Sequence, residues 1–109
     1  KNFPATGGFG PWLVTTDEIP DPTRLTLTTR LNGQEVQKGT IDDLIFDIPY
    51  IVEYVSTFTE LAPGDIISTG TPHGGGLGRK PPLWMKAGDV IEVEISRIGI
   101  LRNVVTAES

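Results

Sequence analysis

The sequence of 109 residues contains no cysteine and only one histidine. Without thiols, the chain has neither a disulfide framework nor a thiolate nucleophile or metal site, which suits a reducing cytoplasm. Basic residues are also few, because 9 lysines and arginines face 14 aspartates and glutamates and leave a net charge of −5. Nucleic acids and anionic membranes require a concentrated basic face, so the sequence argues against both as partners.

Long apolar runs are missing as well. No stretch approaches the ~20 apolar residues of a membrane helix, and the N-terminus lacks the apolar segment of a signal peptide. We therefore expect a cytoplasmic protein. Residues 1–109 fit a single domain segment, in which 13 glycines and 9 prolines predict many turns. The chain begins with Lys1 rather than Met, so we expect a processed protein or a piece of a longer one.

Polar and apolar residues alternate along much of the chain, which is typical of strands. Residues 11–16 (PWLVTT) predict a short strand. Residues 24–38 predict a β-hairpin, because Asn32-Gly33 is a strong turn signal. Turns at residues 62–65 and 86–89 precede two further predicted strands, Ile66-Ile67 and residues 90–95. A last strand is expected over residues 101–106.

One helix is expected, beginning after the N-cap Asp47 with Pro49 in its first turn and ending near Thr57. Its apolar face consists of Ile48, Ile51, Val52, Val55 and Phe58. These elements predict an α+β fold that is predominantly antiparallel β, with this amphipathic helix covering the sheet.

Residues alone say little about chemistry. The phosphate-loop patterns are missing between Gly70 and Lys80, and His73 has no evident partner. The acidic pairs Asp17-Glu18 and Asp42-Asp43 are read as solvated charge, because neighbouring carboxylates on a strand point to opposite faces. Residues 68–75 (STGTPHGG) leave two readings open: a plain turn, or a site where exposed backbone N–H groups hold a ligand.

Short motifs, each weak by itself, follow one another in a characteristic order. They are Lys1-Asn2-Phe3; Phe9-Gly10-Pro11-Trp12 and Thr16-Asp17-Glu18-Ile19; Leu31-Asn32-Gly33 with Gln37; Pro63-Gly64-Asp65 with Thr69-Gly70-Thr71-Pro72; and Lys86-Ala87-Gly88-Asp89 with Ile98-Gly99 and Leu101-Arg102-Asn103. In this order the sequence resembles the C-terminal half of the catalytic domain of the fumarylacetoacetate hydrolase family. The resemblance covers essentially the whole chain.

The resemblance implies a mixed β-roll with one main helix, a homodimer, and activity on small 2-oxo acids. We expect part of a Mg²⁺-dependent hydrolase that cleaves a C–C bond in a 2,4-dioxo acid such as an acylpyruvate or a fumarylacetoacetate-like compound. Two alternatives stay open. One is a decarboxylase or isomerase of the same family acting on 2-oxo dicarboxylates in aromatic catabolism. The other is a non-catalytic β module that serves dimerisation or carboxylate binding.

The resemblance also implies roles for four residues. Lys1 matches the catalytic lysine of the family's Lys-x-Phe segment, where an ammonium group would stabilise a developing oxyanion. Gly70 and Thr71 belong to the Thr-Gly-Thr-Pro turn that lies against the oxo-acid end of the substrate. A hydroxyl and free N–H groups can bind carboxylate oxygens there, and glycine permits close approach. Thr6 is a further substrate-binding candidate, in a loop longer than in several family members.

The resemblance implies Mg²⁺ as cofactor, with Mn²⁺ or Ca²⁺ as substitutes. The family's metal ligands, a Glu-x-Glu pair and a later aspartate, precede the Lys-x-Phe segment, as does its catalytic base. We therefore expect no metal ligands in this chain, and carboxylate ligands upstream of it. A fragment of this kind should be inactive alone, and should stay folded through partners or with part of its core exposed.

Overall fold

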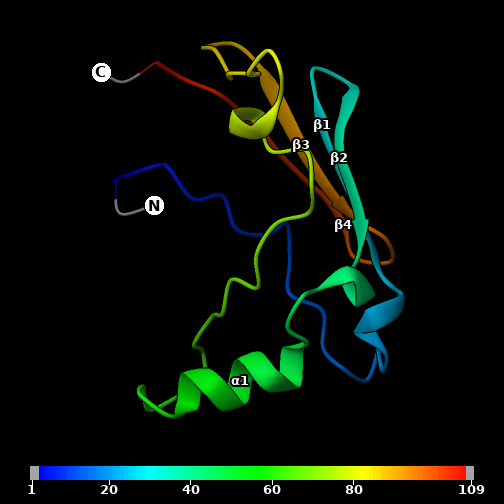
Figure 1. The fold of residues 1–109 in the computed structure, drawn as a ribbon, viewed down its shortest axis with the longest axis vertical. Coiled ribbons are helices and arrows are strands. Elements are labelled where there is room, and N and C mark those ends of the chain that lie inside the picture. The colour runs from blue at the N-terminus through cyan, green and yellow to red at the C-terminus, as the bar shows by residue number, and fades with distance from the viewer. Residues whose placement is uncertain (1–2, 108–109) are drawn as a thin grey trace.

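The computed structural model describes residues 3–107, which contain four β-strands, one α-helix and three short 3-10 helices. The strands are β1 (Thr26–Leu31), β2 (Gln34–Thr40), β3 (Val90–Ile95) and β4 (Gly99–Val104); the helices are α1 (Ile48–Ser56), η1 (Pro22–Arg24), η2 (Ile41–Asp43) and η3 (Gly76–Gly78). Figure 1 shows the strands gathered in one sheet and α1 at the opposite end of the molecule. The predicted α+β fold, mostly antiparallel β, is confirmed.

The sheet has the strand order β2-β1-β3-β4, and neighbouring strands are antiparallel. The predicted hairpin is confirmed, because Asn32 and Gly33 connect β1 to β2 with positive φ angles of 51° and 81°. β2 forms one edge of the sheet and contains an irregularity, since the register shifts between Thr29 and Arg30 and leaves Val36 without a partner in β1.

The turn before β3 is tied to this hairpin by the side chain of Asn32. Its Nδ2 donates to Oδ1 of Asp89 at 2.9 Å, and its Oδ1 accepts the backbone N–H of Val90 at 2.8 Å. Asp89 also accepts the backbone N–H of Lys86 at 2.7 Å. The two bonds that Asp89 accepts, that from Asn32 first, lower its pKa below the ordinary value of 3.8. The predicted turn and strand here are confirmed, and β4 follows with bounds shifted by two residues from the expectation.

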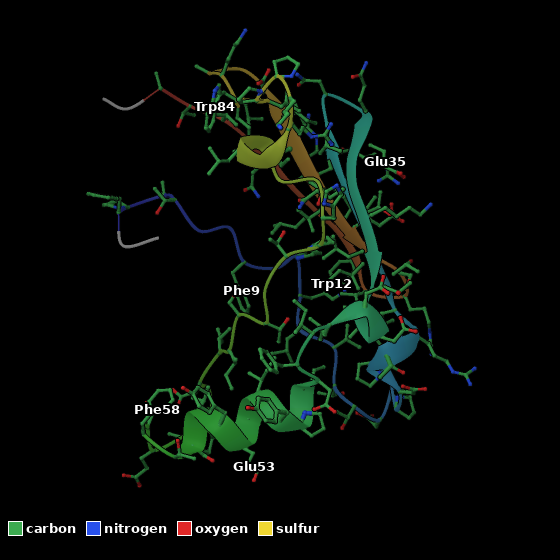
Figure 2. All side chains as sticks on the ribbon, in the orientation of Figure 1. Phe9, Trp12, Glu35, Glu53, Phe58 and Trp84 are labelled. Atoms are coloured by element: carbon green, nitrogen blue, oxygen red, sulfur yellow. The ribbon has the colours of Figure 1, made fainter. Side chains whose placement is uncertain are left out.

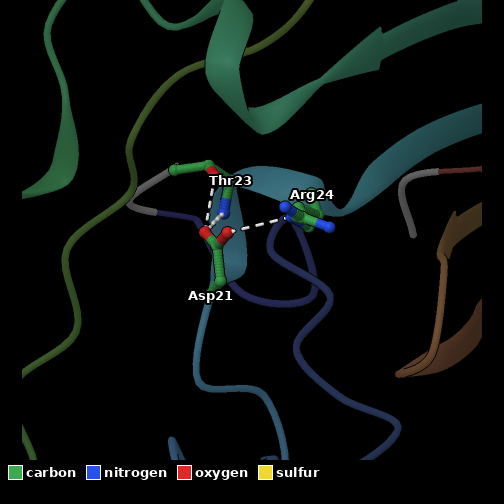
Figure 3. A network of polar contacts seen from close by, with 3 residues as sticks. All are labelled: Asp21, Thr23 and Arg24. Atoms are coloured by element: carbon green, nitrogen blue, oxygen red, sulfur yellow. Dashed lines mark hydrogen bonds and ion pairs between the residues drawn. The ribbon is translucent and has the colours of Figure 1, made fainter.

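A polar network fixes the chain where it enters β1. Asp21 is the N-cap of η1 and accepts the backbone N–H of Thr23 at 3.1 Å as well as its hydroxyl, while Nε of Arg24 lies 3.2 Å from the second carboxylate oxygen (Figure 3). Leu25 then accepts the N–H of Ile41 at 3.0 Å, which joins η2 to the start of the sheet.

α1 has the predicted bounds but not the predicted place. Asp47 is its N-cap, accepting the N–H of Tyr50 at 2.8 Å, and Thr57 follows the last helical residue. The expectation that this helix covers the sheet is wrong: α1 lies beyond one end of the sheet and has almost no contact with the strands (Figure 1). Accordingly Val52 and Phe58 of its expected apolar face are exposed. Periodicity shows that a face is apolar but does not say what covers it.

Two predicted strands are also wrong. Residues 11–16 form no strand, and the side chain of Trp12 holds them to the sheet: its Nε1 donates to the carbonyl of Ile98 at 2.7 Å. Ile66 and Ile67 follow the predicted turn, in which the backbone N–H of Asp65 donates to the carbonyl of Ala62 at 3.0 Å. The two isoleucines belong to no strand. This segment links α1 to the sheet (Figure 1), and within residues 3–107 it pairs with no strand.

The core is small for a chain of this size. Within residues 3–107 the buried apolar side chains are Ile19, Leu25 and Leu31. The accessible surface is 8846 Å² for 11.8 kDa, whereas a compact monomer of this mass exposes about 5900 Å². Exposed aromatic residues lie at opposite ends of the molecule, Trp84 near the tip of the sheet and Phe58 at the end of α1 (Figure 2). Much apolar surface therefore remains exposed in this chain.

Candidate functional site

A hollow of about 560 Å³ lies where the hairpin, η2 and the segment after residue 68 meet. Its lining comes from parts of the chain that are distant in sequence. The lining residues are Leu27, Gly39, Thr40, Ile41, Asp43, Leu44, Ile45, Phe46, Ile51, Thr69, Gly70, Thr71, Pro72 and His73. The turn singled out in the sequence thus lines this hollow.

The two sides of the hollow differ in chemistry. Residues 69–73 contribute two threonine hydroxyls, an imidazole and the open backbone at Gly70. Gly70 has a φ of 119°, and a Cβ built on it would meet nothing within 4 Å, so a ligand can approach its backbone closely. The opposite side is mostly apolar, with Ile45 and Phe46 prominent and exposed. A small molecule with a polar, anionic end and an apolar remainder matches this division.

Thr71 and Pro72 are held by a side chain of the edge strand. Nε2 of Gln37 donates to Oγ1 of Thr71 at 3.0 Å and to the carbonyl of Pro72 at 2.8 Å. The same strand approaches the turn closely at Gly39, where a Cβ would lie 2.9 Å from Cβ of Pro72. The position of the Thr71 hydroxyl is therefore set by β2.

The loop after the turn is fastened to β2 in the same way. Arg79 donates through Nε to the carbonyl of Gly74 at 3.1 Å and through Nη2 to the carbonyl of Val36. Val36 is the residue without a register partner at the irregularity of β2, so the guanidinium binds a carbonyl at the point where the pairing with β1 is interrupted. Gly74 can approach because it has no side chain: a Cβ there would lie 2.5 Å from the oxygen of Val36. The loop is thus held against β2, an edge strand of the sheet.

Of the four site residues expected from the sequence, Gly70 and Thr71 line the hollow. Thr6 does not: it is exposed, and its hydroxyl donates to the carbonyl of Phe3 at 2.7 Å, which closes a local turn. The proposed role of Thr6 in this hollow therefore has no support from the structure. Lys1 lies outside the described residues.

Two further residues line the hollow, Asp43 and His73, and neither was predicted from the sequence as a site residue. Asp43 lies at the end of η2, where it accepts the N–H of Thr40 at 3.4 Å. The spacing of Thr40 and Asp43 is a capping pattern that could have placed the carboxylate at a turn rather than on a strand. For His73 no local signal was available, because only the fold brings the turn to η2.

Among residues 3–107 no group of three or more histidines, cysteines, aspartates or glutamates is placed to hold a metal ion. The hollow offers one carboxylate and one imidazole, at Asp43 and His73. A divalent cation takes more ligands than these, so the described residues do not fit a metal site by themselves. The helices of this part of the chain are also too short or too polar to cross a membrane.

Several solved structures share this fold. A fumarylacetoacetate hydrolase from psychrophilic Exiguobacterium antarcticum superposes with a TM-score of 0.88 at 44% identity, over 93% of this chain and 36% of that one. Maleylpyruvate hydrolase from Sphingobium sp. SYK-6, in complex with manganese(II) ion and pyruvate, superposes with a TM-score of 0.81 at 36% identity, over 92% of this chain and 35% of that one. A 5-carboxymethyl-2-hydroxymuconate delta-isomerase from Mycobacterium smegmatis superposes with a TM-score of 0.79 at 38% identity, over 92% of this chain and 36% of that one.

The sequence comparisons agree. A protein from Burkholderia cenocepacia (strain HI2424), named as a candidate hydrolase, is 45% identical to this chain over 100 residues. These residues are 91% of this chain and 36% of that protein. The chain thus spans little more than a third of this relative. The family model of the fumarylacetoacetate (FAA) hydrolase C-terminal region matches residues 1–106. Its relatives include hydrolases and isomerases, and the chain belongs to the fumarylacetoacetate hydrolase family.

Proposed function

We propose that this chain is the oxo-acid-binding part of a longer hydrolase that cleaves a C–C bond in a 2,4-dioxo acid, such as an acylpyruvate or a fumarylacetoacetate-like compound. One observation carries the proposal: the turn with Gly70 and Thr71 lines a hollow whose opposite side is apolar. The Thr71 hydroxyl and backbone N–H groups of the turn would bind the carboxylate of the substrate, and the apolar side would take its distal part.

The reaction requires a bound water. Its oxygen adds to the distal carbonyl carbon, the C–C bond breaks, and the electron pair stays with the oxo-acid fragment as an enolate that then takes a proton. From an acylpyruvate the products are a carboxylic acid and pyruvate. The Sphingobium relative, which holds pyruvate and manganese(II), supports a site for a 2-oxo acid in this fold.

Mg²⁺ or Mn²⁺, when bound, would polarise the carbonyl groups of the substrate. Since residues 3–107 do not fit a metal site, its ligands would lie in polypeptide outside this chain. Lys1 stays our candidate for the cation that stabilises the enolate oxygen.

A second candidate function is isomerisation of a 2-oxo or 2-hydroxy dicarboxylate, which moves a proton and needs no attacking water. The similarity to the delta-isomerase of Mycobacterium smegmatis favours it. The two candidates share the carboxylate site and differ in the distal step, so incubation with an acylpyruvate and with a hydroxymuconate derivative separates them. Release of pyruvate from the first supports hydrolysis, and a spectral shift without cleavage in the second supports isomerisation.

The excess of exposed apolar surface supports the proposal that the chain works joined to further polypeptide and as a homodimer. A cytoplasmic location, with a small-molecule substrate and neither nucleic acid nor membrane as partner, accords with the acidic composition. Light scattering on the full-length protein measures the oligomeric state, and a monomer would contradict the dimer.

Binding of oxalate by the full-length protein, with and without Mg²⁺, tests the site, because oxalate imitates the chelating end of a 2-oxo acid. We expect binding that depends on Mg²⁺ and that Thr71→Val weakens about tenfold, since a hydrogen bond to a charged group is lost. Thr69→Val, in the same turn, tells whether one hydroxyl or both contribute. Failure of the full-length protein to bind oxalate under either condition would remove the support for an oxo-acid enzyme.

A further inference from the structure

We propose that Gln37 is a positioning residue, which acts by fixing the direction in which the Thr71 hydroxyl donates its proton. Its amide occupies the acceptor side of that hydroxyl and leaves the O–H free for a carboxylate oxygen in the hollow. The inference rests on the proposed function, because it assumes that Thr71 binds the oxo-acid end of the substrate.

The orientation of the Gln37 amide follows from its second partner. A backbone carbonyl can only accept a hydrogen bond, so the atom 2.8 Å from the oxygen of Pro72 must be the amide nitrogen. The same nitrogen lies 3.0 Å from Oγ1 of Thr71. Its two hydrogens therefore go to these two oxygens, and the Thr71 oxygen is an acceptor in this contact.

A threonine hydroxyl has one proton to donate and two lone pairs. With one lone pair taken by Gln37, the proton of Thr71 must point to another acceptor. Thr71 is exposed and lines the hollow, so the free direction of its O–H includes the space that a ligand would fill. A carboxylate has only acceptor atoms, and a hydroxyl arranged in this way meets it without first breaking a bond of its own.

Gln37 itself lies behind the turn. It is half-buried on β2 and lines a separate smaller hollow with Val36 and Gly74, whereas it is missing from the lining of the larger one. Further contacts join β2 to the loop on either side of Gln37: Gly39 packs on Pro72, and Arg79 binds the carbonyl of Val36. Gln37 therefore reaches the ligand only through Thr71.

A double-mutant cycle on the full-length protein tests this arrangement, with the dissociation constant of oxalate in saturating Mg²⁺ as the readout. Gln37→Met keeps the length of the side chain and removes both donors, and Thr71→Val keeps the shape and removes the hydroxyl. We expect each single variant to weaken oxalate about tenfold, and Gln37→Met to have almost no further effect in the Thr71→Val background. Gln34→Met, on the same strand, controls for loss of an amide elsewhere.

Gln37→Glu gives a second, nearly isosteric test. A carboxylate at this place accepts a hydrogen bond from Thr71 and turns its proton away from the hollow, so oxalate binding should fall more than for Gln37→Met. The same change in the Thr71→Val background measures the effect of the added charge alone. Thermal unfolding of each variant shows whether it is folded, and Gln37→Glu replaces Gln37→Met in the cycle should the latter unfold.

Equal weakening by Gln37→Met with and without the Thr71 hydroxyl would overturn the proposal, because Gln37 would then act through Pro72 or through folding. If the parent protein binds no oxalate with Mg²⁺, the proposed function fails and the role of Gln37 fails with it. Oxalate binding without coupling between the two residues overturns the role of Gln37 alone.

Discussion

Gly39 lies so close to Pro72 that a Cβ on the glycine would approach Cβ of the proline to 2.9 Å. One residue belongs to the edge strand β2 and the other to the turn that lines the hollow. Two features of β2 therefore position the turn: Gly39 has no side chain to push Pro72 away, and the amide of Gln37 binds Thr71 and Pro72.

We expect Gly39→Ala to push the turn away from β2. Its added methyl group must displace Pro72, which moves Thr71 with it, so oxalate binding by the full-length protein should weaken severalfold, and stability should fall by about 1–3 kcal/mol for overpacking. Gly75→Ala, in the loop that follows Pro72, is a control for adding a methyl group, because a Cβ there meets nothing within 4 Å. Equal oxalate affinity for Gly39→Ala and the wild type would show that the close approach does not position Thr71.

Acid should weaken the clamp between Asn32 and Asp89. The pKa of Asp89 is lowered in the folded protein, first by the Asn32 amide, so the carboxylate stabilises the fold above its ordinary pKa of 3.8 and loses this effect as pH falls through the folded value. Urea unfolding at pH 6 and pH 3 measures it. Asp89→Asn should destabilise the protein at pH 6 more than at pH 3.

Glu53→Gln on exposed α1 controls for the loss of one negative charge in that comparison. Asn32→Ala should reduce the pH dependence as well, because it removes the largest cause of the lowered pKa. A difference between Asp89→Asn and the wild type that is the same at both pH values would contradict the assignment.

The indole of Trp12 fastens the N-terminal segment to the β3–β4 turn. Its N–H donates to the carbonyl of Ile98 at 2.7 Å, and its ring lies 3.0 Å from the Cβ position of Gly99. Trp12→Phe removes the donor and part of the ring, and should cost about 1–2 kcal/mol in thermal or urea unfolding. Phe9→Leu, at an exposed aromatic residue nearby in the sequence, should cost less. Equal losses of unfolding free energy in both variants would show that the hydrogen bond of the Trp12 indole does not stabilise the fold.

α1 should be unstable when this chain is produced alone. Helices shorter than about 12–15 residues are marginal in water without tertiary packing, and α1 has 9 residues with almost no contact to the sheet. Four exposed rings follow one another along α1 and its flanks: Phe46, Tyr50 and Tyr54 are stacked, and Phe58 meets Tyr54 edge to face.

Hydrogen exchange should therefore be fast at the amides of α1 in the isolated chain and slow in the full-length protein, and a dye that binds apolar surface should bind only the isolated chain. Protection of α1 in both would show that the aromatic row stabilises the helix by itself.

The sequence by itself determined the local structure of this protein. Asn32-Gly33 demands a tight turn because both residues adopt positive φ, Asp47 caps a helix because its carboxylate reaches the N–H of Tyr50, and residues 86–89 turn before β3. The order of short motifs was also sufficient for the family. It singled out Gly70 and Thr71 as well, and both residues line the hollow. These features depend on neighbours in the chain or on a pattern along it.

Only the tertiary structure decided where these pieces lie relative to one another. Residues 11–16 and Ile66-Ile67 have the composition of strands but belong to no sheet, and α1 has an apolar face but almost no contact with the strands. The contact of Gln37 with Thr71 and the places of Asp43 and His73 in the hollow likewise join distant segments. The physical reason is that hydrogen bonds and packing between distant segments depend on the whole fold, which propensity and spacing do not encode.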